Sequence, residues 1–264
     1  MFAKLLKHEI KSTGGLLGIL SAASLSLAVL GGFLIRFSIN SAAGEEATIR
    51  AFSIASAVAL PLIFLSLFAY VFGSEIYLIV QFYKRKYTDQ GYLTFTLPVA
   101  TWKIYVTSLL NMMMWMFIIA VVAIVSFLSL YLIGIYDSEI WQILTEAGTE
   151  ISEIFDFIDV ELGAWGIISP VVSFISSNVL MITGITIGCV VARKHKILAS
   201  IGFYYLISMA ISSIATILNV SLMFNSADIQ MNQIYMGTSI MHMVAIVAGS
   251  VLTVWLMDKK LNLP

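Results

Sequence analysis

The sequence predicts an all-α, polytopic membrane protein with six transmembrane helices and both termini in the cytoplasm. Of its 264 residues, 60% are hydrophobic and 11% are charged, which is less than half the charged share of a typical soluble domain. The apolar residues gather in six blocks near or above the roughly 20 residues that cross a bilayer core. The charges between the blocks are sorted by sign, and this sorting sets the expected orientation.

The six blocks are separated by short polar connections and one longer acidic segment. They run approximately over residues 16–37, 51–80, 104–135, 165–192, 197–224 and 236–257. We therefore treat residues 1–264 as a single transmembrane domain. Basic residues occur before the first block, between the second and third, between the fourth and fifth, and after the sixth: Lys4, Lys7, Lys11, Lys84, Arg85, Lys86, Lys103, Arg193, Lys194, Lys196, Lys259 and Lys260.

The opposite side of the membrane is expected to be acidic. Residues 136–164 contain eight acidic side chains and neither Lys nor Arg, while Arg36 and Arg50 are the two basic exceptions on that side. Because basic loops remain in the cytoplasm, this segment should be extracellular. Its apolar residues recur at helical spacing, which predicts an amphipathic helix. It is either a lid with solvated carboxylates or a negative surface that attracts cationic molecules, with candidate residues Glu146, Glu150, Glu153 and Asp156.

The N-terminus predicts an amphipathic helix over residues 1–13, on the inner membrane surface. Phe2, Leu5, Leu6 and Ile10 recur at helical spacing, whereas the opposite face carries Lys4, Lys7, His8 and Lys11. Gly14 and Gly15 would then turn the chain into the first span. A secretory signal peptide ending near Ser41-Ala42-Ala43 is the alternative, but the first apolar block is longer than such segments usually are.

The connection between the second and third spans has an unusual composition. Thr88 or Asp89 is suited to cap a short helix, which must end before Pro98. Tyr92, Leu93, Phe95 and Leu97 are many large apolar side chains for a short solvated loop. An exposed apolar patch of this kind commonly marks a docking surface. A segment that rests on lipid headgroups is the alternative.

These features resemble the membrane permease subunits of ABC-2-type ABC transporters, especially small six-span forms from Gram-positive bacteria. The resemblance rests on the start Phe2-Ala3-Lys4-Leu5-Leu6-Lys7-His8-Glu9-Ile10-Lys11, the loop Gly91-Tyr92-Leu93-Thr94-Phe95-Thr96-Leu97-Pro98-Val99 and the six-span topology. It implies a connecting helix at residues 1–13 and a cytoplasmic coupling helix that docks on a separate ATPase. The implied docking residues are Thr88, Asp89, Gln90, Gly91, Tyr92, Leu93 and Phe95.

The resemblance also implies an assembly in a bacterial plasma membrane. A second permease chain, identical or different, would join this one, and the partner ATPase would bind ATP and Mg²⁺. The sequence itself contains no G-x-x-x-x-G-K-[ST] phosphate-binding motif, so we expect no cofactor in this chain and no enzymatic activity of its own. Membrane lipid is an expected partner and nucleic acid is not. An amphipathic or antimicrobial peptide is the expected substrate.

Two polar residues inside the predicted spans are candidates for function. Glu75 is costly in a bilayer and needs a partner or water; it either pairs near the inner headgroups with the basic run 84–86 or forms a polar contact that shifts during transport. Asn219 continues a stripe of Ser208, Ser212 and Thr216. A second stripe ends in Gly184-x-x-x-Gly188, a spacing that lets helix backbones approach closely. Both stripes fit packing within one bundle, a transport route or a contact between chains.

Two other classes of protein stay open. An ATP-independent carrier would use Glu75 as its coupling group. Glu45-Glu46-x-x-x-Arg50 resembles a motif of intramembrane CAAX-type glutamate proteases. That family also needs intramembrane His residues, but His8 and His195 lie in basic cytoplasmic segments, and His242 has Thr238 where the family's motif requires Phe. Residues 45–50 are also expected in a short outer loop, where such a site does not fit. The single cysteine, Cys189, excludes disulfides within the chain and is expected to be a packing residue. No metal site is predicted.

Overall fold

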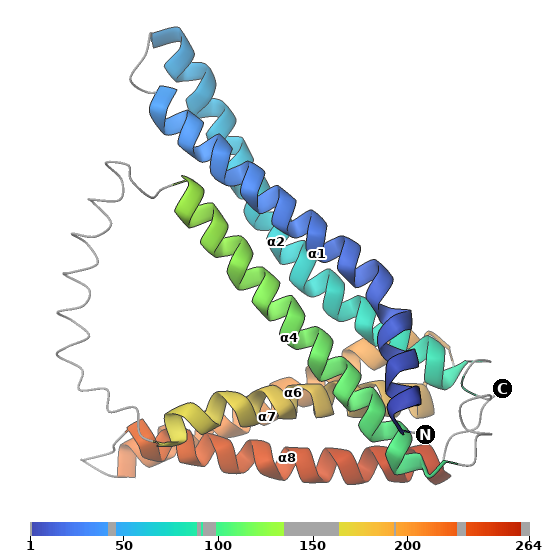
Figure 1. The fold of residues 1–264 in the computed structure, drawn as a ribbon. Coiled ribbons are helices and arrows are strands. Elements are labelled where there is room, and N and C mark those ends of the chain that lie inside the picture. Colours follow the sequence, from blue (N-terminus) through green and yellow to red (C-terminus); the bar gives the residue numbers. More distant parts are fainter. Residues whose placement is uncertain are drawn as a thin grey trace. The chain divides into compact units, whose positions relative to one another are not determined.

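A computed structural model describes residues 2–41, 46–88, 91, 99–134, 164–192, 194–225 and 231–259. The described part contains six long helices and no strand, as the sequence predicts (Figure 1). They are α1 (Phe2–Ser41), α2 (Glu46–Tyr87), α4 (Thr101–Gly134), α6 (Ala164–Val191), α7 (Lys196–Asn225) and α8 (Met231–Lys259). All six are long and apolar enough to cross a membrane. The chain is therefore a multi-pass helical membrane protein.

Several helices extend beyond their apolar blocks. α1 has 40 residues and α2 has 42, which correspond to about 60 Å each at 1.5 Å per residue, roughly twice the thickness of a bilayer core. Residues 46–50, which carry part of the glutamate motif, begin α2, so their expected position in a loop is wrong. Hydrophobicity reports the part of a helix that contacts lipid, and the polar turns at its ends escape that signal.

The chain divides into two compact units. Unit 1 contains residues 1–10, 76–113 and 160–264, and unit 2 contains residues 11–75 and 114–159. Unit 2 is built from long stretches of α1, α2 and α4. Its core contains Ala28, Ile63, Leu67 and Leu130. A β-carbon at Gly31 would lie 2.5 Å from Ile63 Cδ1, so this glycine allows α1 and α2 to approach closely.

The expected turn at Gly14 and Gly15 is wrong, because α1 is continuous from Phe2 to Ser41. Gly14 has a different role in unit 2. A β-carbon there would lie 3.2 Å from Cζ2 of Trp115, so the missing side chain makes room for the indole ring. The predicted polar face of the N-terminal segment is nevertheless confirmed: Lys4, Lys7, His8 and Lys11 are all exposed.

In unit 1, α6 packs against α7 and α8. Gly184 and Gly188 lie against the backbone of α7, where an added β-carbon would be 2.6 Å from Tyr204 Cα and 2.5 Å from Ser200 Cα respectively. The predicted close approach at these glycines is confirmed, and the partner helix belongs to the same chain. On the other side of α6, Thr183 Oγ1 and Thr253 Oγ1 of α8 share a hydrogen bond of 2.9 Å.

Candidate functional site

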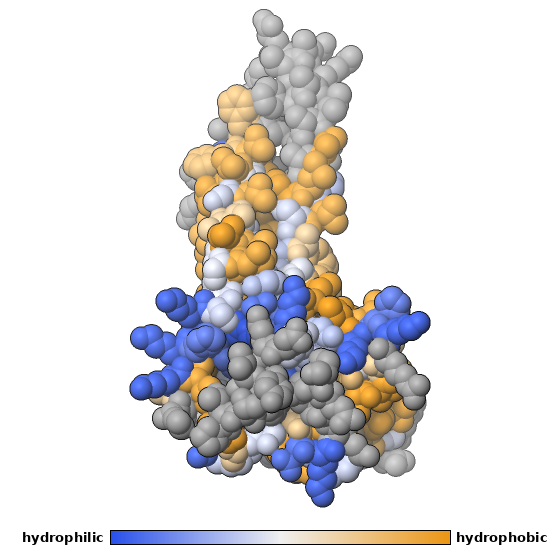
Figure 2. All heavy atoms as spheres, turned by 90° about the vertical axis from the view of Figure 1, so that its right-hand side faces the viewer, coloured by the Kyte–Doolittle hydropathy of each residue, from blue (hydrophilic) through white to orange (hydrophobic). Residues whose placement is uncertain are grey.

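The basic residues of unit 1 lie at the helix ends that meet on one side of this unit. The start of α1, the end of α2, the start of α4, the start of α7 and the end of α8 supply them, and hydrophilic side chains gather on the face that Figure 2 turns toward the viewer. The described basic residues at these ends are Lys4, Lys7, Lys84, Arg85, Lys86, Lys103, Lys194, Lys196 and Lys259. We call this side the basic end. Its side chains make the polar contacts that follow.

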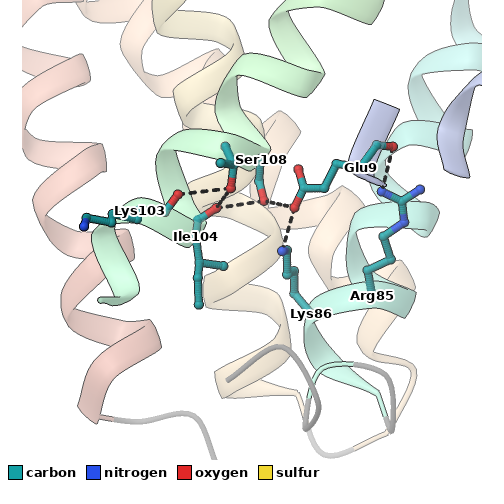
Figure 3. Close-up of polar contacts among 7 residues, drawn as sticks. Glu9, Arg85, Lys86, Lys103, Ile104 and Ser108 are labelled. Carbon is teal, nitrogen blue, oxygen red and sulfur yellow. Dashed lines mark hydrogen bonds and ion pairs between the residues drawn. The ribbon is translucent and has the colours of Figure 1, made fainter. Parts of the chain in front are cut away.

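A buried ion pair joins three helices at the basic end (Figure 3). Lys86 Nζ of α2 lies 2.7 Å from Glu9 Oε1 of α1, and the two side chains are 5% and 8% exposed. Ser108 of α4 donates a hydrogen bond of 2.9 Å to the same carboxylate oxygen. Two unlike charges removed from water must be paired to be tolerated. The Glu9 carboxylate is therefore the group on which the ends of α1, α2 and α4 converge.

Arg85 adds a contact to the backbone of the same residue. Its Nη1 donates a hydrogen bond of 3.1 Å to the carbonyl oxygen of Glu9, while Lys103 lies near the cluster with its ammonium group directed away from it (Figure 3). Two consecutive residues of α2 thus hold Glu9, one by its side chain and one by its main chain. Glu9 and Thr13 are both buried and are four residues apart, so they share one face of the helix.

The connection between α2 and α4 begins directly after this ion pair, because α2 ends at Tyr87. Thr88 Oγ1 donates a hydrogen bond to the carbonyl oxygen of Lys84, and Gly91 N donates one of 2.7 Å to the carbonyl oxygen of Thr88. Gly91 is buried, and a β-carbon there would lie 2.3 Å from the carbonyl oxygen of Lys86. The start of the connection is thus folded tightly against the turn of α2 that carries Lys86.

Two further hydrogen bonds connect helices of unit 1. Tyr87 and Thr186 hydroxyls lie 2.7 Å apart and join α2 to α6. Tyr105 and Ser250 hydroxyls lie 2.8 Å apart and join α4 to α8. Both tyrosines are buried, and a buried hydroxyl without a partner is costly. The two helices that flank the connection are therefore bonded both to α1 and to the α6–α8 bundle.

The structure describes some of the predicted site residues and leaves others outside its described ranges. Of the expected docking residues, Thr88 and Gly91 are described as above, while Asp89, Gln90, Tyr92, Leu93 and Phe95 lie outside the described residues. The outer acidic residues Glu146, Glu150, Glu153 and Asp156 lie outside them too.

The intramembrane candidates differ from each other. Asn219 Nδ2 donates a hydrogen bond of 2.9 Å to Thr238 Oγ1 and so links α7 to α8, whereas Ser212 and Thr216 of the same stripe are exposed. Glu75 is half-buried and makes no hydrogen bond or ion pair with the described part of the chain. The expected pairing of Glu75 with the basic run is therefore not found there. The acid that pairs with this run is Glu9.

Glu9 is the residue that sequence reasoning missed. Its signal is present but indirect, because it is the one acidic side chain among the three lysines and the histidine of residues 1–13. Leu5 and Leu6 lie four and three residues before it, so helical spacing places this acid on the apolar face, away from the lysines. Burial of Glu9 follows from tertiary packing against Lys86 and Ser108, which are 77 and 99 residues away along the chain, and no local pattern reports such contacts.

Comparisons with known proteins add nothing to the class of protein that the fold defines. No protein-family model, no curated protein and no solved structure matches this chain. Cys189 is buried, as expected of a packing residue. Among the described residues, no three His, Cys, Asp or Glu side chains are grouped as a metal ion requires. The chain is a multi-pass membrane protein whose best-defined polar cluster is the buried ion pair at its basic end.

Proposed function

We propose that this chain is the transmembrane subunit of an ATP-driven ABC transporter in a bacterial plasma membrane. A separate cytoplasmic ATPase would bind to the connection between α2 and α4, and a second permease chain would complete the transport route. The substrate class we propose is an amphipathic or antimicrobial peptide, exported or cleared from the membrane. The sequence resemblance and the six apolar helices support this proposal.

The observation that carries the proposal is the way in which the connection is anchored. Lys86 precedes it and Ser108 follows it, and both side chains bind one buried carboxylate of α1. A push on residues 88–100 would therefore act on α1, α2 and α4 together, because a buried ion pair and its hydrogen bonds resist separation. A docking segment that transmits the closure of an ATPase needs such a stiff attachment.

The sorting of charge supports the proposed orientation. The described basic residues of the helix ends lie together, on the side of unit 1 from which the connection leaves. Helix ends rich in Lys and Arg stay in the cytoplasm during insertion. In this orientation, the connection faces the compartment that contains ATP and soluble ATPases.

The proposal is tested by purifying the tagged chain from its native membrane in mild detergent. We expect a stoichiometric ATPase, identified by mass spectrometry, and vanadate-sensitive ATP hydrolysis in the eluate. Phe95→Asp should abolish both, since a charge in an apolar docking surface is costly, while Phe95→Leu should retain both. The size-exclusion profile of each variant reports folding. A chain that folds and carries no ATPase in either form would refute the proposal.

An ATP-independent carrier is the second candidate, and Glu75 is the observation in its favour. A half-buried carboxylate inside a span, without a partner in the described part of the chain, is a natural group for proton or cation coupling. A carrier would transport in proteoliposomes without ATP, driven by an ion gradient, and would lose that dependence in Glu75→Gln.

A further inference from the structure

A pocket of about 580 Å³ lies at the basic end, between the last turns of α2 and the first turns of α7. Its lining is Tyr83, His195, Lys196, Ile197, Leu198 and Ile201. All six residues belong to unit 1. None of them takes part in the ion pair of Glu9, so the pocket is separate from the cluster described above.

The polar half of this lining is suited to an anion. Lys196 supplies a positive charge, His195 an exposed imidazole and Tyr83 a hydroxyl group. The first turn of α7 also lines the pocket. In this turn, Ala199 N donates a hydrogen bond of 3.1 Å to the carbonyl oxygen of His195. The amide groups of the three residues between them have no acceptor within the helix. Such amides and a neighbouring Lys together form a common phosphate-binding arrangement.

The other half of the lining is apolar. Ile197 and Ile201 are half-buried, and Leu198 is 72% exposed. A water-soluble anion gains nothing from these side chains, whereas an acyl chain attached to the anion would cover them. The stretch of α7 that is apolar enough to span a membrane begins at Lys196. The pocket therefore lies where hydrocarbon gives way to the headgroup layer.

From this combination of charge, apolar surface and depth, we propose that the pocket binds an anionic phospholipid. The headgroup phosphate lies against Lys196, His195 and Tyr83, and an acyl chain lies along Leu198 and Ile201. Basic pockets between transmembrane helices on the cytoplasmic side select such lipids. This inference does not depend on an ATPase partner, so it stands or fails separately from the proposed transport function.

The experiment uses the purified full chain in detergent and native mass spectrometry with added phosphatidylglycerol or phosphatidylcholine carrying the same acyl chains. We expect phosphatidylglycerol to bind more tightly. Lys196→Ala should weaken its binding about five-fold, the factor that one basic residue contributes near an anionic surface, and Lys196→Arg should restore it. Lys259→Ala is the matched control, because Lys259 is exposed at the same end but is absent from the pocket lining.

Three results would overturn the proposal. The first is equal binding of the two lipids to the unmodified chain. The second is equal weakening by Lys196→Ala and Lys259→Ala, which would indicate attraction to the basic end as a whole. The third is full displacement of the lipid by inorganic phosphate, which would assign the pocket to a free phosphate ion. Persistence of the bound lipid in excess phosphate supports the proposal.

Discussion

Removal of Lys86 from the buried ion pair gives the sharpest test of the site. In Lys86→Met the apolar stem of the side chain is retained and the ammonium group is lost. Glu9 then keeps its hydrogen bond from Ser108, but its charge has lost the partner at 2.7 Å, in a position where the Glu9 side chain is 8% exposed. We expect strong destabilisation, because the carboxylate must stay buried without a counter-ion, take up a proton or break the local packing.

The magnitude follows from two opposing terms. At 2.7 Å and an effective dielectric constant of about 20, the attraction between the two charges is about 6 kcal/mol. Desolvation of the two ions costs several kcal/mol each, so the intact pair adds little net stability. Loss of one partner removes the attraction but leaves one desolvated charge, and this typically costs about 3–5 kcal/mol. The double variant Glu9→Gln/Lys86→Met removes both charges and should recover most of that loss.

The assay is reversible unfolding in mixed micelles, with the free energy of unfolding measured for the unmodified chain, both single variants and the double variant. Lys84→Met is the matched control, because Lys84 is exposed in the same turn of α2; its effect should be within about 0.5 kcal/mol. Additive effects of Glu9→Gln and Lys86→Met would refute the reasoning, since the two residues would then not interact. A coupling energy above about 2 kcal/mol would agree with it.

Two glycines give the remaining predictions. Gly188→Val should lower the free energy of unfolding by more than about 1–3 kcal/mol, because the new side chain meets the backbone of Ser200. The control is Gly202→Ala, where a β-carbon has nothing within 4 Å, and it should be neutral or slightly stabilising in the same micelle assay. An equal loss of unfolding free energy in both variants would contradict the packing argument. Gly91→Ala should lower the ATPase activity of the purified complex by displacing the connection from Lys86, while the unfolding midpoint of the helices stays near that of the unmodified chain. An unchanged ATPase rate would show that this contact is dispensable.

The six long apolar helices of the described residues could be predicted from the sequence, whereas their lengths could not. Blocks of apolar residues identify the part of each helix that contacts lipid, and all six were found in this way. α1 continues through Gly14 and Gly15 because a glycine in a helix costs only about 0.5–1 kcal/mol, which close packing against Trp115 offsets. The sequence alone therefore does not distinguish a glycine pair that ends a helix from one that lets a neighbouring side chain pack against a continuous helix.

The candidate site, too, could be predicted from the sequence only in part. The composition of the connection and the excess of basic residues at the helix ends were visible in the sequence, and Gly184 and Gly188 were correctly expected to lie against a helix. Glu75 was the acid considered as a partner for the basic run, because it is close to that run along the chain, and Glu9 was not considered. Glu75 is nine residues before Lys84 on the same helix, about 13 Å along its axis at 1.5 Å per residue. That separation is too long for an ion pair, and Glu9 reaches Lys86 from another helix.

For the mechanism, the position of the ion pair matters more than its net contribution to stability. A pair of apolar side chains at positions 9 and 86 would hold α1 against α2 about as well, because the charged pair is close to neutral in its net contribution. What apolar side chains would not fix is the register, since they pack acceptably in several positions. A carboxylate that must meet one ammonium group and one hydroxyl group has a single acceptable position. On this view the ion pair specifies the alignment of α1 with the two helices that flank the connection, so a double apolar variant that stays folded should lose the response to an ATPase before it loses stability.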